Sequence, residues 1–160
     1  MFLLPKLYEY ELGKAADILV NELFKLKKDE TFVITADTES DSRVVDATAR
    51  AAFAAGAKPM VIWTPSPLGV GKAADPMLPQ KALTAVLKEA DAWAEFNNQW
   101  LLYSTPYDIA VQENPQLRHM CLVGMNVDMM IRCIERVNYP VLKELEEKLA
   151  EKTRKAKKVR

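Results

Sequence analysis

Four short apolar runs alternate with longer amphipathic segments along this chain of 160 residues, and this alternation limits the possible folds more than any other feature. Residues 31–35 and 59–63 are too continuously apolar for strands with one exposed face, so we expect both to be buried. Comparable runs cover residues 92–96 and 117–123. The alternation predicts an α/β fold: a three-layer, four-stranded parallel sheet of flavodoxin or Rossmann type, with strand order 2-1-3-4 and helices on both faces.

The segments between these runs have the residue spacing of amphipathic helices. In the first segment the apolar residues recur at steps of three and four, with charged residues between them. Ser40 or Asp41 can cap the second helix, which ends before Gly56, and Asn126 can cap a later one. The expected helices cover residues 11–27, 41–55, 79–89, 107–112, 126–136 and 139–158.

Length and composition indicate one globular domain that spans residues 1–160. Hydrophobic residues make up 49% of the chain, and its 22 basic and 22 acidic residues leave no excess charge to attract nucleic acid or an anionic membrane. We therefore expect neither of them as a partner. The polar helix of residues 138–160 would either lead toward a missing C-terminal domain or end as a solvated terminus.

Three further features favour a cytoplasmic protein. Residues 1–6 are interrupted by Pro5 and the charged Lys6, and they lack the apolar core of a secretory signal. No run approaches the roughly 18 apolar residues of a membrane span. Cys121 and Cys133 both lie in apolar runs, so we expect two buried free thiols in a reducing compartment rather than a disulfide.

Ligands of open parallel sheets bind beyond the carboxyl ends of the strands. After the first strand, Asp37, Thr38 and the carboxylates that follow suit helix capping, ligand contact or a metal. Asn97, after the third strand, can hydrogen-bond either a ligand or the neighbouring loops. His119 is the only histidine and lies within a strand, so we interpret it as structural. No Ser-His-Asp arrangement or Rossmann glycine fingerprint accompanies these residues, and we expect no catalytic, metal or cofactor site that is complete within this chain.

Several segments together resemble a known family in their order and spacing. They are AADILV, VITADT, EFN, LLYS and CLVGM, at residues 15–20, 33–38, 95–97, 101–104 and 121–125. These segments resemble the N-terminal half of the family that unites the thermophilic-type leucyl aminopeptidases, which are metallopeptidases, with 2,5-dihydroxypyridine 5,6-dioxygenase. They are framework segments, typical of the family rather than of one reaction.

The resemblance implies that in full-length relatives a larger C-terminal part supplies His, Asp and Glu ligands for a divalent metal, which would be Fe, Zn, Co or Mn. None of those ligands maps onto this chain. The stretch of residues 102–104 approaches the substrate in the dioxygenase relatives, and Tyr103 stands where they have a histidine, a departure that argues against the hydroxypyridine reaction. The residues expected to face a substrate are Asp37, Thr38, Asn97, Leu102, Tyr103, Ser104 and Asp128.

Two functions follow as hypotheses. In the first, the chain is the non-catalytic N-terminal domain of an aminopeptidase-like or dioxygenase-like metalloenzyme and forms one wall of the cleft for a small-molecule substrate. Its partner would be the C-terminal half of the same enzyme or a second copy of itself. In the alternative, the chain is a stand-alone small-molecule-binding or protein-interaction domain without enzymatic activity, in which Trp63, Trp100 and Met125 provide contacts.

Overall fold

A computed structural model describes residues 8–158 of the chain. The prediction that residues 1–6 carry no secretory signal concerns residues outside this range. Residues 159–160, the last two of the predicted C-terminal helix, also lie outside it. Within residues 8–158, no helix is both long enough and apolar enough to cross a membrane. The elements are α1 (Glu9–Asp17), the π-helix η1 (Ile18–Leu23), β1 (Thr31–Asp37), α2 (Ser42–Ala54), β2 (Lys58–Thr64), the 3₁₀ helix η2 (Gly71–Met77), α3 (Gln80–Lys88), β3 (Ala92–Glu95), α4 (Thr105–Glu113), β4 (Arg118–Cys121), α5 (Val127–Met130), the π-helix η3 (Ile131–Glu135) and α6 (Tyr139–Lys155).

The four strands form one parallel sheet in the order β2-β1-β3-β4, which confirms the predicted order. β1 lies between two neighbours, and every one of its residues after Thr31 is buried. Thr31 pairs with Lys58 of β2, and Phe32 pairs with Ala92 of β3. Because the strands all run the same way, their carboxyl ends meet at one side of the sheet, which we call the carboxyl edge.

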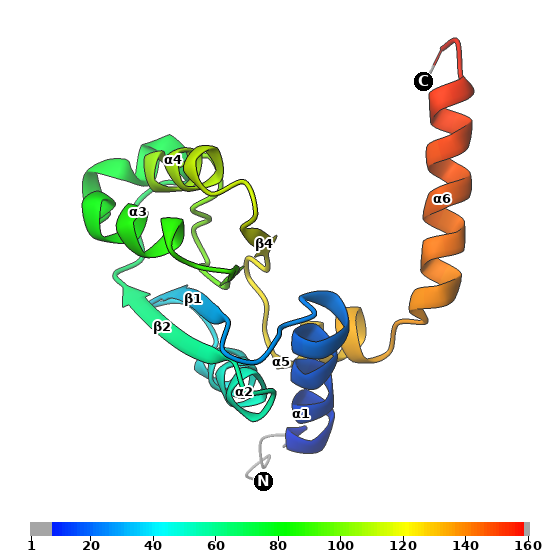
Figure 1. Cartoon of the computed structure of the whole chain (residues 1–160), viewed down its shortest axis with the longest axis horizontal. Coiled ribbons are helices and arrows are strands. Elements are labelled where there is room, and N and C mark those ends of the chain that lie inside the picture. Colours follow the sequence, from blue (N-terminus) through cyan, green and yellow to red (C-terminus); the bar gives the residue numbers. More distant parts are fainter. Residues whose placement is uncertain (1–7, 159–160) are drawn as a thin grey trace, which may run out of the picture.

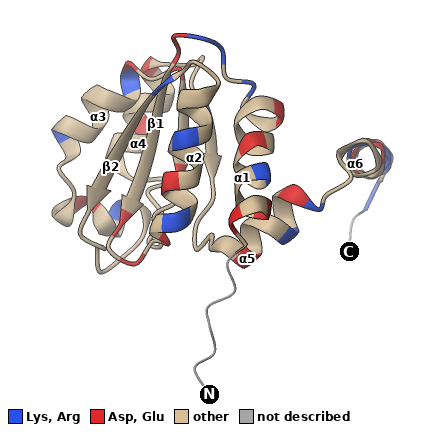
Figure 2. Ribbon diagram, turned by 90° about the horizontal axis from the view of Figure 1, so that it is seen from below, with Lys and Arg blue, Asp and Glu red and all other residues tan. Residues whose placement is uncertain are grey.

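Helices cover both faces of the sheet and make a three-layer α/β fold (Figures 1 and 2). Successive side chains of a strand point to opposite faces. Phe32 and Ile34 accordingly join the core formed with α1, α2 and α5. Val33 and Trp93 join the second core, formed with η2, α3 and α4. The sheet is therefore packed on both sides, as the predicted architecture requires.

β2 differs from the prediction that residues 59–63 are buried. Met60, Val61 and Trp63 are 45%, 38% and 47% exposed. The prediction was wrong because β2 is the outermost strand, and the helices on the two faces leave its apolar side chains open. Its composition is that of a buried strand, but its position is that of an edge.

The prediction of buried thiols was wrong as well. Cys121 is the last residue of the other outer strand, β4, and Cys133 lies in η3. Both are exposed free cysteines. An apolar run in the sequence does not show which residues of an outer strand or helix face the core and which face solvent.

α6 stands apart from the sheet and its covering helices (Figure 1). None of its residues is buried. Asn138 caps its first turn by accepting a hydrogen bond from the Val141 N–H at 3.3 Å. Leu145 and Leu149 are each 53% exposed, so the apolar stripe of this helix has no partner among residues 8–158.

Candidate functional site

Three polar side chains lie where neighbouring strands end at the carboxyl edge. Asp37 and Thr64 are the last residues of β1 and β2 and are partners in the sheet register. Thr35 of β1 and Glu95 of β3 are also register partners. Asp37 and Asn97 each follow these partners by two residues, so they lie at corresponding positions. By strand alternation all three belong to the face covered by η2, α3 and α4. Asp37 and Asn97 are completely buried, and Thr64 is nearly so.

Asp37 holds the loops of this edge together. Its Oδ1 accepts a hydrogen bond from the Glu39 N–H at 2.9 Å, and its Oδ2 accepts one from the Gln99 N–H at 3.0 Å. The Ser40 hydroxyl donates to the carbonyl of Phe96 at 2.9 Å. The loop after β1 is thus tied to the loop after β3, and the Asp37 carboxylate is occupied by the protein itself.

Asn97 and Thr64 are different, because no described residue satisfies their buried polar atoms. Both amide atoms of Asn97, Nδ2 and Oδ1, and the Thr64 hydroxyl lack a hydrogen-bond partner within residues 8–158. Leaving such a group unpaired costs about 1–3 kcal/mol, and most buried polar groups in folded proteins are paired. These two side chains are the polar groups of the edge that the fold does not use.

The loop that follows β3 beside this edge, residues 98–104, contains a strained residue. Tyr103 has a φ of 66°, a left-handed conformation that is uncommon for a residue other than glycine, and its ring is 64% exposed. Gly71 donates its N–H to the carbonyl of Trp100 at 3.0 Å. A Cβ on Gly71 would lie 3.1 Å from the carbonyl oxygen of Leu102, so η2 can approach the loop this closely because residue 71 is glycine.

The other residues expected to face a substrate lie in different surroundings. Ser104 is buried and accepts a hydrogen bond from the Tyr107 N–H at 3.4 Å as the cap of α4. Thr38 is exposed, and its hydroxyl accepts from the Ser66 N–H at 3.1 Å. Asp128 is exposed on α5 and bonds Arg132 at 2.8 Å. The structure therefore brings Asp37 and Asn97 together beside the loop that carries Leu102, Tyr103 and Ser104, whereas Asp128 is engaged elsewhere. Contact of these residues with a substrate stays a prediction.

A buried carboxylate, Glu95, links this loop to β4. It is completely buried and accepts a hydrogen bond from the Leu101 N–H. Its other oxygen lies 3.1 Å from Nε2 of His119. The His119 ring stacks on Trp93 with a centroid distance of 4.2 Å. The interpretation of His119 as structural fits these contacts, since its ring is fixed between a carboxylate and an aromatic side chain.

Cys121 completes this group and is not a nucleophile at neutral pH. Although Cys121 as a whole is exposed, neighbouring atoms shield its thiol from water; this desolvation, together with the negative charge of the neighbouring Glu95, raises the pKa of the Cys121 thiol to about 11. A protonated thiol donates a weak hydrogen bond but does not attack a substrate. The group of Glu95, His119 and Cys121 therefore positions the loop, without Cys–His chemistry.

Sequence reasoning did not single out Glu95 or Thr64. A signal for Glu95 was available, because it is the one charged residue in the apolar run of residues 92–96. A carboxylate inside a buried strand needs partners, and its position therefore predicts a polar cluster. Thr64 gave no comparable signal, since threonine is common at the ends of strands.

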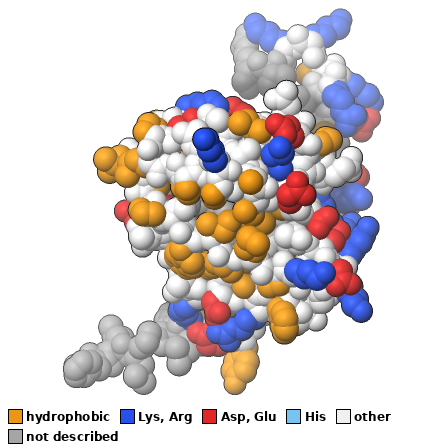
Figure 3. All heavy atoms as spheres, turned by 60° about the vertical axis from the view of Figure 1, so that its left-hand side comes forward, with side chains coloured by type: hydrophobic (Ala, Val, Ile, Leu, Met, Phe, Trp, Pro, Cys, Tyr) orange, Lys and Arg blue, Asp and Glu red, His pale blue; other side chains and the backbone are white. Residues whose placement is uncertain are grey.

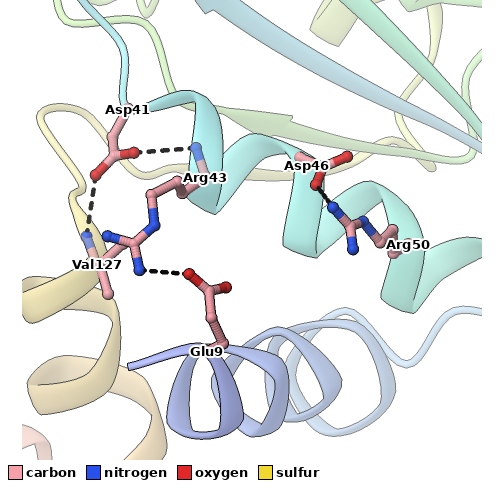
Figure 4. Close-up of polar contacts among 6 residues, drawn as sticks. All are labelled: Glu9, Asp41, Arg43, Asp46, Arg50 and Val127. Carbon is pink, nitrogen blue, oxygen red and sulfur yellow. Dashed lines mark hydrogen bonds and ion pairs between the residues drawn. The ribbon is translucent and has the colours of Figure 1, made fainter. Parts of the chain in front are cut away.

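A surface cavity of about 790 Å³ lies between α1 and α2. Its rim is charged, but the charges bond one another: Arg43 bonds Glu9 at 2.7 Å, and Arg50 bonds Asp46 (Figure 4). Asp41, the confirmed cap of α2, accepts the Arg43 N–H at 3.0 Å and the Val127 N–H at 3.3 Å. Because these polar groups are already paired, we place the candidate site at the carboxyl edge.

The described residues do not fit a metal. Within residues 8–158, no group of three or more His, Cys, Asp or Glu side chains is arranged to hold an ion. His119 and Cys121 each bond Glu95 instead. No step of a reaction can be assigned to a metal held by these residues alone.

Comparison with known proteins shows a remote relationship of fold. The chain matches no family model and no curated protein sequence. It superposes on 2,5-dihydroxypyridine dioxygenase from Pseudomonas putida KT2440 with a TM-score of 0.56 and 19% identity, over 74% of this chain and 35% of that one. It superposes on AmpT from Thermus thermophilus with a TM-score of 0.51 and 15% identity, over 79% of this chain and 42% of that one. The chain spans less than half the length of either structure, and what it shares with them is the fold.

Proposed function

We propose that this chain is the non-catalytic N-terminal domain of an aminopeptidase-like or dihydroxypyridine-dioxygenase-like metalloenzyme, and that its carboxyl edge forms one wall of a small-molecule substrate cleft. The remote fold relationship to the dioxygenase and to AmpT supports this assignment. In the proposal, a second part of the enzyme holds the divalent metal, since the described residues form no cluster that fits one. That part is the expected partner of this domain.

The observation that carries the proposal is the unpaired amide of Asn97. A completely buried amide with neither atom satisfied is costly, and each such group in a native protein needs an explanation. Its position at the carboxyl edge is where parallel sheets bind ligands. An amide offers two N–H donors and one acceptor, so it can bind the carbonyl, carboxylate or hydroxyl group of a small substrate.

The loop of residues 98–104 gives the substrate a way to reach Asn97. Tyr103 is exposed at the rim, and its strained backbone marks the point where the loop stores energy that a rearrangement can release. Opening of residues 98–104 would expose Asn97, and the Tyr103 hydroxyl could then donate a hydrogen bond to the same ligand. In this role the domain binds and orients the substrate, and it transfers no proton.

Nuclear magnetic resonance on the ¹⁵N-labelled chain tests this role with two probes, L-leucinamide and 2,5-dihydroxypyridine. We expect at least one of them to shift the amide signals of residues 97–104 and of the loop after Asp37. Asn97→Ala should abolish these shifts. Asn21→Ala is the matched control, because Asn21 is exposed on η1 and its amide bonds Asp17 at 2.7 Å; it should leave the shifts unchanged.

Two outcomes would contradict the proposal. If neither probe shifts the carboxyl edge, or if Asn97→Ala responds as the wild type does, the edge is not a substrate wall. Turnover of either probe by the 160-residue chain alone would show that the domain is catalytic by itself.

A further inference from the structure

The outer side of β2 carries unpaired backbone groups. Lys58 donates its N–H to the carbonyl of Glu30 at 2.7 Å, on the side of β1. Backbone groups alternate between the two sides of a strand, so Pro59, Val61 and Trp63 present theirs to the open side. No strand within residues 8–158 pairs there. Pro59 has no N–H, which suits an edge position, but nothing blocks the edge at Val61 and Trp63.

Apolar side chains surround these backbone groups. Met60 points to one face of the sheet and Val61 and Trp63 to the other, and all three are at least 38% exposed. We call these three residues the edge patch. Figure 3, which brings the β2 side of the molecule forward, shows apolar side chains gathered over the middle of this face. Charged residues are more usual at an open edge, because they prevent pairing with other strands.

The size of the edge patch fits a reversible interface. With about 200 Å² for a large side chain, the exposed fractions of the three residues amount to roughly 260 Å² on each copy. Two copies would then bury about 500 Å² from these side chains, and the paired strands would add backbone area, which gives an interface at the small end of the range for specific complexes. A dimer of this size would form at micromolar concentration rather than permanently.

The one charge of β2 permits pairing with a second copy of this chain and favours an antiparallel orientation of the two strands. Lys58 is the only charged residue of β2, and it pairs with Asp29 of its own chain at 3.2 Å. In an antiparallel pair of β2 strands the two Lys58 residues lie at opposite ends, whereas a parallel pair would place them together. Like charges directly opposite each other destabilise a strand pair, and the antiparallel arrangement avoids them.

We propose that two copies of the chain dimerise through β2, antiparallel and about a two-fold axis at Val61, and join their sheets into one. An axis at the middle residue places all seven residues of the two strands opposite one another. The N–H and C=O of Val61 then pair with those of Val61 of the partner subunit. Trp63 donates its N–H to the carbonyl of the partner's Pro59. The interface is self-complementary, as a two-fold dimer requires, and it is independent of the function proposed for the carboxyl edge.

Sedimentation velocity on the 160-residue chain tests the dimer. The wild type should sediment as a concentration-dependent dimer at micromolar concentration. Val61→Glu places two negative charges at the axis and should weaken dimerisation by about tenfold or more. Leu145→Glu is the matched control, because Leu145 is an exposed apolar residue on α6, and it should leave the dimer intact. Circular dichroism checks that both variants fold.

A disulfide provides a positive test that does not depend on the folding of Val61→Glu. In a background with Cys121→Ser and Cys133→Ser, Val61→Cys places two sulfurs across the axis. The Cα atoms of such a pair are ~5.5 Å apart, within the range that a disulfide spans. Val61→Cys should form a covalent dimer under mild oxidation, and Leu145→Cys should not.

Three results would overturn the proposal. The first is a wild-type chain that stays monomeric throughout the micromolar range. The second is a dimer that Leu145→Glu dissociates and Val61→Glu does not, which would assign the interface to α6. The third is failure of Val61→Cys to cross-link under conditions in which the wild type is dimeric.

Discussion

The outer strands β2 and β4 each have one neighbour in the sheet, but their side chains lie in opposite surroundings. β4 has four residues, and its polar side chains bond inward: Arg118 bonds Glu30 at 2.6 Å, and His119 lies 3.1 Å from Glu95. β2 has seven residues and leaves Val61 and Trp63 half open to solvent. Polar side chains that are bonded within the protein give the β4 edge little apolar surface for a partner, whereas the exposed apolar side chains of β2 favour pairing.

The difference separates two properties of the chain. Contacts at the β4 edge stabilise the monomer and fix the loop of the candidate site, because Glu95 bonds both Leu101 and His119. The exposed side chains of β2 contribute less to the monomer and, in the proposal, contact a second copy. Substitutions at the β4 edge should therefore change the free energy of unfolding, and substitutions at the β2 edge should change association.

The largest effect on stability is expected at Glu95. Glu95→Ala leaves the Leu101 N–H and the His119 ring without their partner in a buried site, so the free energy of unfolding should fall by about 3 kcal/mol or more. Urea unfolding followed by circular dichroism measures this change. Glu39→Ala removes an exposed carboxylate that accepts from Asn98 and should have a much smaller effect. Equal losses in the two variants would show that Glu95 does not hold the β4 edge.

The next effect concerns the reactivity of Cys121. Its pKa rises from 9.0 to about 11, first through desolvation of the thiol and then through the charge of Glu95, so at pH 8 its thiolate is about a hundredfold rarer than that of an ordinary thiol. Alkylation by iodoacetamide, followed by mass spectrometry, should be slower by about this factor in the native chain than in urea. Glu95→Gln removes the charge and should accelerate the native reaction. A native rate equal to the rate in urea would contradict the prediction.

The raised pKa of Cys121 makes the free energy of unfolding depend on pH. The folded state keeps the Cys121 proton at pH values where the unfolded state has lost it. The resulting stabilisation is complete below pH 9 and is lost as the pH rises toward about 11. Urea midpoints of the wild type should therefore fall across this interval, and those of Cys121→Ser should fall less.

A smaller loss is expected at His119. His119→Ala removes the bond to Glu95 and the stacking contact with Trp93, and together these contribute about 2 kcal/mol to the free energy of unfolding. The variant should also loosen the loop at Leu101, which hydrogen exchange of that amide can detect. An unchanged free energy of unfolding and unchanged exchange of the Leu101 amide would mean that His119 does not stabilise the β4 edge.

Local patterns allowed the sequence to predict the elements, but not which edges are open. The parallel sheet follows from the alternation of runs, and its predicted strand order is confirmed. Residue type predicted a cap of α2 at Ser40 or Asp41 and a cap of α5 at Asn126, and the structure has Asp41 and Asn126. The predicted burial of residues 59–63 was wrong because the composition of an apolar run does not show whether a helix of the same chain or another subunit covers it. The unpaired state of Asn97 was out of reach, because it depends on loops far apart in the sequence.

The smallest effect on the monomer is expected at Trp63, and it tests the comparison most directly. Trp63→Thr removes a ring that is 47% exposed and introduces a residue that strands also favour, so the free energy of unfolding of the dilute monomer should change by less than about 1 kcal/mol. Trp93→Thr makes the same change at a completely buried ring of β3 and should cost about 3–5 kcal/mol. Sedimentation should show the reverse order, because Trp63→Thr removes part of the edge patch and Trp93→Thr does not. If the two substitutions destabilised the dilute monomer equally, β2 would be part of the core, and its apolar side chains would need no second copy to explain them.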